Sequence, residues 1–324
     1  MIIVTGAAGF IGSVIVWELN QKGITDIIVS DKMRDGNKWK NLVKLKYYDW
    51  IDKDELFDFL AVEENAKTIT AIIHMGAISA TTEKNVDLLM SNNYKFTMKL
   101  WNFCTKRDVQ YIYASSAATY GGGKLGYNDD HAGVPSLKPL NPYGYSKQIF
   151  DEWALKQEKS PSKWQGLKFF NVYGPQEYHK GRMASVIFHA FNQTREKGVV
   201  NLFKSYKKGY VDGGQLRDFV YIKDITEVIV FMLKNKIENG LYNLGSGQAR
   251  SFFDLAKNTM IAMGEELNIH FIEMPEDIRD KYQYFTEANM EKLKRNGYTK
   301  PFYTLEEGIE DYVKNYLMQE DSYL

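Results

Sequence analysis

The chain has 324 residues, of which 44% are hydrophobic and 25% are charged, a balance typical of a soluble globular protein. Basic and acidic residues number 41 each, so the formal net charge is zero and nothing in the composition favours nucleic acid or acidic membranes. One cysteine excludes an intrachain disulfide. No apolar run reaches the ~20 residues of a membrane helix, and a strand pattern starts at Ile2, so we expect a cytoplasmic protein without a signal peptide.

A glycine-rich turn follows the first predicted strand. Residues 2–4 are β-branched, glycines follow with the spacing G-x-x-G-x-x-G, and a helix is predicted over 10–21. In a dinucleotide site Gly6 permits the tight turn, Gly9 lets the pyrophosphate approach the backbone, and Gly12 lets the helix pack on the strand. The helix N-terminus offers free N–H groups to the phosphates. This stretch therefore predicts a bound dinucleotide.

An acidic residue ends the second predicted strand, 27–30. Asp31 lies about 20 positions beyond the glycine turn, where an acid binds the adenosine ribose hydroxyls and favours NAD. Four cations stand in the nine positions that follow it, and they are able to hold the 2′-phosphate of NADP instead: Lys32, Arg34, Lys38 and Lys40. A solvated loop is the alternative for these cations. The residues alone leave the choice between NAD and NADP open.

Two later strands deliver small or polar residues at their ends. The predicted strand 71–74 ends in the small-residue turn 75–79, where a cofactor would pass. The strand 111–114 leads to Ser116, whose hydroxyl suits a hydrogen bond to a substrate oxygen. Between them, Asn92 and Asn93 are predicted to open a helix. An asparagine there would bond the cofactor or the backbone, with a helix cap as the alternative.

Strands alternate with helices through the first half, which predicts an α/β fold with a Rossmann-type doubly wound parallel sheet. A smaller α/β substrate-binding domain is expected after it. We expect the dinucleotide-binding domain at 1–170 and a mainly substrate-binding domain at 171–324. A segment at about 218–247 is expected to cross back to the first domain.

Tyr143 and Lys147 lie one helical turn apart and share a helix face. A phenol titrates near pH ~10, and a neighbouring ammonium favours its anion and makes it a usable base. The expected sheet places Tyr143 near Ser116, beyond the carboxyl ends of the strands. The pair also occurs by chance on ordinary helices, so the glycine turn is what makes it informative.

Several motifs now coincide: the glycine turn, Asp31, Ser116, Tyr143-x-x-x-Lys147, and Arg-Asp-Phe-Val-Tyr at 217–221. Together they resemble the extended short-chain dehydrogenase/reductase family of nucleotide-sugar enzymes. The match is closer to the branch of that family that epimerises an ADP-linked heptose. The segments that carry this closer match are 114–122, 170–175, 179–186 and 300–302. The resemblance runs from Met1 to about Tyr312.

The resemblance implies an ADP-heptose substrate inverted at C6″ for lipopolysaccharide inner-core supply. The route would be oxidation to a ketone and re-reduction on tightly bound NADP, one per subunit, with NAD possible. Tyr143 and Lys180 would be the two acid/base groups. Ser116 would bond the reacting oxygen, and Lys147 would hold the nicotinamide ribose and lower the pKa of the phenol. A homo-oligomer, a pentamer by resemblance, is expected, without metal, nucleic acid or membrane partners.

The resemblance also carries binding positions onto this sequence. For the cofactor they are Gly6, Gly9, Phe10, Ile11, Gly12, Asp31, Lys32, Lys38, Lys53, Met75, Gly76, Ala77, Ile78, Ser79, Asn92, Lys147 and Val172. For the substrate they are Ser116, Asn171, Arg182, His189, Phe203, Lys204, Ser205, Tyr206, Arg217 and Tyr282.

Three other functions compete with this one. A 4,6-dehydratase usually has an acidic pair after the strand hydroxyl, whereas Ala117 and Ala118 follow Ser116 here. A UDP-hexose 4-epimerase would share Ser116, Tyr143 and Lys147 but has no need of Lys180. A non-catalytic dinucleotide sensor has no reason to keep those three residues together.

Overall fold

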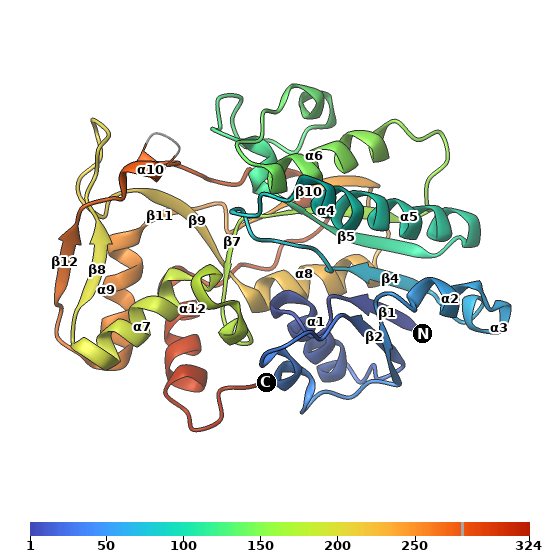
Figure 1. Ribbon diagram of the computed structural model, residues 1–324, viewed down its shortest axis with the longest axis horizontal. Coiled ribbons are helices and arrows are strands. Elements are labelled where there is room, and N and C mark those ends of the chain that lie inside the picture. The colour runs from blue at the N-terminus through green and yellow to red at the C-terminus, as the bar shows by residue number, and fades with distance from the viewer. Residues whose placement is uncertain (280–281) are drawn as a thin grey trace.

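A seven-stranded parallel sheet forms the centre of the larger part of the molecule (Figure 1). The structure is a computed structural model and describes residues 1–279 and 282–324. The strands lie in the order β3-β2-β1-β4-β5-β6-β10. In that order they span Asp49–Asp52, Ile27–Asp31, Ile2–Thr5, Ala71–His74, Gln110–Ser116, Trp164–Phe169 and Gly240–Leu244. The order reverses between β1 and β4, so the predicted doubly wound sheet is confirmed.

Both faces of this sheet are buried, because successive side chains of a strand point to opposite faces. Ile3 and Ile72 belong to one apolar cluster, and their neighbours Val4 and Ile73 belong to the other. The first face is covered by α2, α5 and α6, and the second by α1 and α8. These helices span Leu56–Ala61, Phe96–Arg107, Pro142–Leu155, Phe10–Gln21 and Ile222–Lys234, and the short α3 follows α2 at Glu63–Ala66.

The helix predicted to open at Asn92 begins earlier, so that prediction is wrong. It starts as α4 (Val86–Leu89), continues through a π-helical turn at Met90–Lys95, and runs on as α5. The cap is Asn85, whose side chain accepts a hydrogen bond from Leu88 N at 2.9 Å. Asn93 instead exchanges two hydrogen bonds of 2.9 Å with the backbone of Ile78. Its amide therefore fixes the turn after β4 rather than the end of a helix.

The second part of the chain forms two small sheets and flanking helices (Figure 1). The sheets have the orders β11-β9-β7 and β12-β8. Their strands are β7 (Asn171–Tyr173), β8 (Val200–Phe203), β9 (Leu216–Tyr221), β11 (Ala249–Ser251) and β12 (Ile269–Ile272). The helices are α7 (Val186–Lys197), α9 (Phe252–Met263), α10 (Glu276–Arg279), α11 (Glu291–Arg295) and α12 (Leu305–Tyr312).

The chain leaves the large sheet after β6 and returns to it after β9. Helix α8 packs against α1, and β10 pairs with β6 at the edge of the large sheet. The end of the chain also returns, because Lys44 forms an ion pair of 2.7 Å with Asp321. Across the described ranges, no helix combines the length and apolar character needed to cross a membrane.

Candidate functional site

A cavity of about 680 Å³ opens at the carboxyl ends of β1, β2, β4 and β5. Parallel topology brings these strand ends to one edge of the sheet, which is where ligands bind in such folds. All of the positions predicted for the cofactor line this cavity, as do Ser116, Tyr143 and Lys180. Further lining residues that the sequence did not single out include Phe96, Phe169, Phe170, His179 and Met183.

The glycine turn has the geometry that a pyrophosphate requires. Gly6 has φ +66°, and a β-carbon there would stand 2.6 Å from Gly76 N. A β-carbon on Gly12 would meet the Gly6 carbonyl at 2.2 Å, so the helix packs on the turn only with glycine at this position. Gly9 precedes α1 and supplies no side-chain cap, which leaves the first-turn N–H groups to a ligand. These residues fit a dinucleotide.

Asp31 is held in place by three donors. Its carboxylate accepts hydrogen bonds from Ala8 N at 2.9 Å, from Lys32 N at 2.7 Å and from Lys38 Nζ at 2.6 Å. Lys32 Nζ pairs with Asp54, and Arg34 also lines the cavity. Lys40 lies over the ring of Trp39 instead, at 6.0 Å. Of the four cations considered for a 2′-phosphate, three therefore face the cavity.

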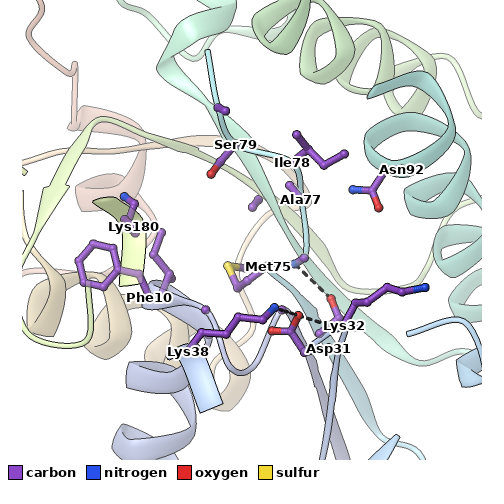
Figure 2. A pocket seen from close by; sticks show the side chains of 18 of the residues that line it. Phe10, Asp31, Lys32, Lys38, Met75, Ala77, Ile78, Ser79, Asn92 and Lys180 are labelled. Atoms are coloured by element: carbon purple, nitrogen blue, oxygen red, sulfur yellow. Dashed lines mark hydrogen bonds and ion pairs between the residues drawn. The ribbon is translucent and has the colours of Figure 1, made fainter. Parts of the chain in front are cut away.

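Figure 2 shows how the cofactor positions are distributed around the cavity. Asp31 and Lys38 lie together at the end of β2, and Asn92 and Ile78 lie toward the other side. Lys53 Nζ donates to Asn92 Oδ1 at 2.5 Å, and burial lowers the pKa of this lysine. Asn92 is thus a cavity residue in mid-helix.

Tyr143 lies in the first turn of α6, which is capped by Asn141 through a 2.8 Å hydrogen bond from Gly144 N. Lys147 is buried, and its Nζ donates to the carbonyl of Ala114 at 2.7 Å. Burial lowers the pKa of Lys147 to about 8. Burial also raises the pKa of Tyr143, and a hydrogen bond with Ser116 opposes that rise.

The pKa of Tyr143 departs from the resemblance, which implied that Lys147 lowers it. The ammonium is held at the carbonyl of Ala114, and burial of the phenol has the larger effect.

Lys180 belongs to a short 3₁₀ helix, Tyr178–Met183, that lies against α1. Its Nζ stands 5.1 Å from the ring centre of Phe10, and Figure 2 shows the two side chains together at one side of the cavity. Burial lowers the pKa of Lys180, and the charge of Glu177 opposes the lowering. Burial likewise lowers the pKa of His179 to about 4. A lysine that loses its proton more easily is a better base near neutral pH.

The predicted substrate residues, Ser116 apart, lie outside this cavity. The guanidinium of Arg217 stands 5.3 Å from the ring centre of Tyr282, and the rings of Phe203 and Tyr282 are 6.4 Å apart. Beside them, Lys204 Nζ pairs with Glu273 at 2.7 Å, and Tyr206 OH donates to the same carboxylate. The structure thus gathers the residues of 203–206 with Arg217 and Tyr282.

Three substrate positions are placed elsewhere. Asn171 is exposed at the start of β7, Arg182 is exposed at the end of the Lys180 segment, and His189 lies in α7. Their side chains do not line the cavity. The structure does not join these three to the cluster around Arg217.

Sequence reasoning missed a buried ion pair that joins α6 to β6. Lys168 Nζ and Asp151 Oδ2 are 2.8 Å apart, and both side chains are fully buried. Asp151 also accepts from Ser115 Oγ at 2.6 Å, beside Ser116 in β5. Asp151 follows Lys147 by one turn of α6. The available signal was a lone lysine in the apolar run of β6.

No group of three or more His, Cys, Asp or Glu side chains able to hold a metal ion occurs in the part of the chain that the structure describes. In this Rossmann-type sheet the glycine turn, Tyr143 and Lys147 line one cavity. That combination defines a class, the dinucleotide-dependent enzymes.

Comparison with known proteins narrows this class. Residues 2–245 match the NAD dependent epimerase/dehydratase family. The chain is 59% identical to ADP-L-glycero-D-manno-heptose-6-epimerase of Fusobacterium nucleatum and 48% identical to that of Nitratidesulfovibrio vulgaris, over all of each chain. The fold is similar to the crystal structure of ADP-L-glycero-D-manno-heptose-6-epimerase from Helicobacter pylori, with a TM-score of 0.80 and 30% sequence identity. The superposition covers 97% of this chain and 95% of that one. The chain belongs to the NAD-dependent epimerase/dehydratase family.

Proposed function

We propose that the protein converts ADP-D-glycero-D-manno-heptose to ADP-L-glycero-D-manno-heptose by inverting C6″. The observation that carries the proposal is that Lys180 lines the same cavity as Ser116, Tyr143 and Lys147. Inversion through a ketone places the oxygen on different sides of the carbon in the two half-reactions, so a second acid/base group is useful. The names of the relatives support the same reaction.

The protein residues have separable tasks in this reaction. A bound nicotinamide dinucleotide supplies the reversible hydride transfer that makes and reduces the ketone. Tyr143 and Lys180 each exchange a proton with the substrate oxygen, one for each epimer, and Ser116 donates a hydrogen bond to it. Lys147 holds the nicotinamide ribose beside Tyr143.

We propose NADP as the cofactor. Lys32, Arg34 and Lys38 line the cavity around Asp31, and the N–H groups and Lys38 that bind this carboxylate offset its charge. In the cavity lining here three cations stand against two carboxylates, Asp31 and Asp35, and this excess of positive charge favours a 2′-phosphate. Nucleotide released from the purified protein by denaturation is expected to have the mass of NADP. Recovery of NAD alone would overturn this choice.

We also propose that 171–324 mainly binds the sugar nucleotide, with Arg217 and the residues of 203–206 near the ADP moiety. The cluster offers cations for a diphosphate and aromatic rings for a base.

A homo-oligomer, a pentamer by resemblance, is proposed as well. Light scattering tests the mass, and a monomer would contradict it.

The reaction is tested by incubating the protein separately with ADP-heptose and UDP-galactose and following the stereochemistry by NMR. We expect turnover of the heptose alone. Tyr143→Phe and Lys180→Met should each lower kcat by ~10²-fold or more, which is the usual contribution of an acid/base group. The exposed Lys236→Met is the matched control and should leave kcat unchanged.

Two of the alternatives, the hexose 4-epimerase and the sensor, have their own results in this assay. Epimerisation of UDP-galactose without turnover of the heptose indicates a hexose 4-epimerase. Bound dinucleotide without turnover of either sugar indicates a sensor. Wild-type turnover by Lys180→Met removes the second acid/base group from the proposal.

A further inference from the structure

The loop that carries Lys180 is closed by one buried carboxylate. Glu177 is fully buried, and its Oε2 accepts a hydrogen bond from Ser185 N at 2.5 Å. Its Oε1 accepts from Ser185 Oγ at 2.6 Å. Glu177 and Ser185 stand at the two ends of the segment 178–184, so the carboxylate joins these ends and defines the shape of the loop between them.

Each end of this loop is anchored to a larger element. Ser185 Oγ accepts a hydrogen bond from Phe188 N at 3.2 Å and so caps α7. At the other end, Gln176 Nε2 donates to Asn41 O at 3.1 Å. Asn41 Nδ2 donates to Gln176 O at 3.0 Å and to Ala8 O at 3.1 Å. The loop is therefore fixed to α7 and to the glycine turn of the cofactor site.

Closing the loop with a buried carboxylate costs free energy, because burial disfavours the charged form of Glu177. Burial raises the pKa of Glu177, and the nearby charge of Lys180 and the donors of Ser185 oppose that rise. An isosteric amide has only one acceptor oxygen, so it is unable to serve both donors of Ser185 through separate oxygens. The charge of Lys180 favours the ionised form of this carboxylate. The backbone also joins the two residues directly, because Lys180 N donates a hydrogen bond to Glu177 O at 3.0 Å.

We propose that Glu177 is a positioning residue for Lys180. It holds the segment 178–184 in the shape that keeps the ammonium at the cavity wall beside Phe10, and its effect on catalysis passes through that lysine. The inference rests on the proposed function, because the acid/base role of Lys180 belongs to it. It assigns to Glu177 a task that the resemblance does not.

A double-mutant cycle tests whether the effect passes through Lys180. The variants are Glu177→Gln, Lys180→Met and the pair together. Loss of about one net hydrogen bond is worth roughly tenfold, so we expect Glu177→Gln to lower kcat by ~10-fold while KM changes less than ~2-fold. In the Lys180→Met background it should add less than ~2-fold. Losses that multiply fully in the double variant would overturn the proposal.

A second measurement does not depend on turnover. Acetic anhydride labels Lys180, and peptide mass spectrometry follows the labelling rate together with hydrogen exchange over 178–185. We expect both rates to rise by ~10-fold in Glu177→Gln and to stay unchanged in Glu196→Gln, an exposed glutamate of α7. Ser185→Ala removes the Oγ donor and should change both rates in the same direction by less. It serves as the test if Glu177→Gln does not fold.

The two measurements separate the possible failures. Unchanged labelling and exchange in both loop variants would overturn the role of Glu177. Wild-type turnover by Lys180→Met would instead remove the catalytic role of Lys180, while the labelling rates would still decide whether Glu177 holds the loop.

Discussion

The buried ammonium of Lys147 is expected to reduce the stability of the protein. Its side chain is 4% exposed, and its Nζ donates to the carbonyl of Ala114. Burial lowers the pKa of Lys147 from 10.5 to about 8, and the charge of Asp151 opposes the lowering. Since the folded state disfavours this proton, Lys147→Met should raise the free energy of unfolding at pH 7 when no dinucleotide is bound.

The magnitude follows from the shift in pKa. A shift from 10.5 to about 8 is about 2.5 units, which at 1.36 kcal/mol per unit is a penalty of roughly 3 kcal/mol at pH 7. Loss of the hydrogen bond to Ala114 O offsets about 1–2 kcal/mol of the gain. The net stabilisation of Lys147→Met should therefore be roughly 1–2 kcal/mol.

The pH dependence has a definite sign. The folded pKa lies below the unfolded pKa, so between pH 8 and 10.5 the unfolded state binds more protons than the folded state. The stability of the wild type should rise across this window relative to the variant. The advantage of Lys147→Met should therefore shrink as the pH increases from 8.

Urea denaturation between pH 7 and 10 measures both effects. The dinucleotide must be removed first, because a ligand that binds only the folded state adds stability by mass action. Lys236→Met is the control for the same substitution on the surface and should change stability by less than about 0.5 kcal/mol. A Lys147→Met variant less stable than the wild type at pH 7, or a difference constant with pH, would refute the reasoning.

Three further predictions concern residues around the cavity. Asp151→Asn should lower the free energy of unfolding, measured by denaturation, by about 3–5 kcal/mol, because it leaves the buried ammonium of Lys168 without its counter-ion. The double variant Asp151→Leu with Lys168→Met should lower the free energy of unfolding by less than this, and not by the sum of the two single effects. Lys38→Ala should weaken NADP binding by roughly tenfold and NAD binding by less in a fluorescence titration; equal losses would contradict a 2′-phosphate contact. Asn41→Ala should speed hydrogen exchange of 6–12 and 176–183 together, whereas acceleration of one alone would disprove the link.

The parts of the site that could be predicted from sequence follow individual strands. The glycine turn, Asp31 and Ser116 end β1, β2 and β5, and a parallel sheet brings those ends together. The start of the helix around Asn92 could not be read in the same way. An asparagine before an apolar pattern resembles a cap, whereas the hydrogen bonds of Asn93 to Ile78 are tertiary contacts.

The supporting residues were not predictable for a similar reason. Glu177 reads as an ordinary surface acid in a polar segment, and its partner Ser185 becomes its neighbour only when the loop closes. Lys204 and Tyr206 read as free groups for a ligand, whereas both are bound to Glu273, far along the chain. Long-range contacts of this kind leave no periodic pattern in the sequence.

The placement of Tyr143 and Lys180 explains why both parts of the chain contribute to one cavity. Tyr143 belongs to α6, which covers one face of the large sheet, and Lys180 lies against Phe10 of α1, which covers the other. In the proposed reaction the two proton-transfer groups can thus approach the strand ends from different sides. A single helix could not supply both groups, because its side chains enter the cavity from one direction. The crossing of the chain after β6 therefore has a chemical consequence, since it brings the segment with Lys180 to the side that α6 does not reach.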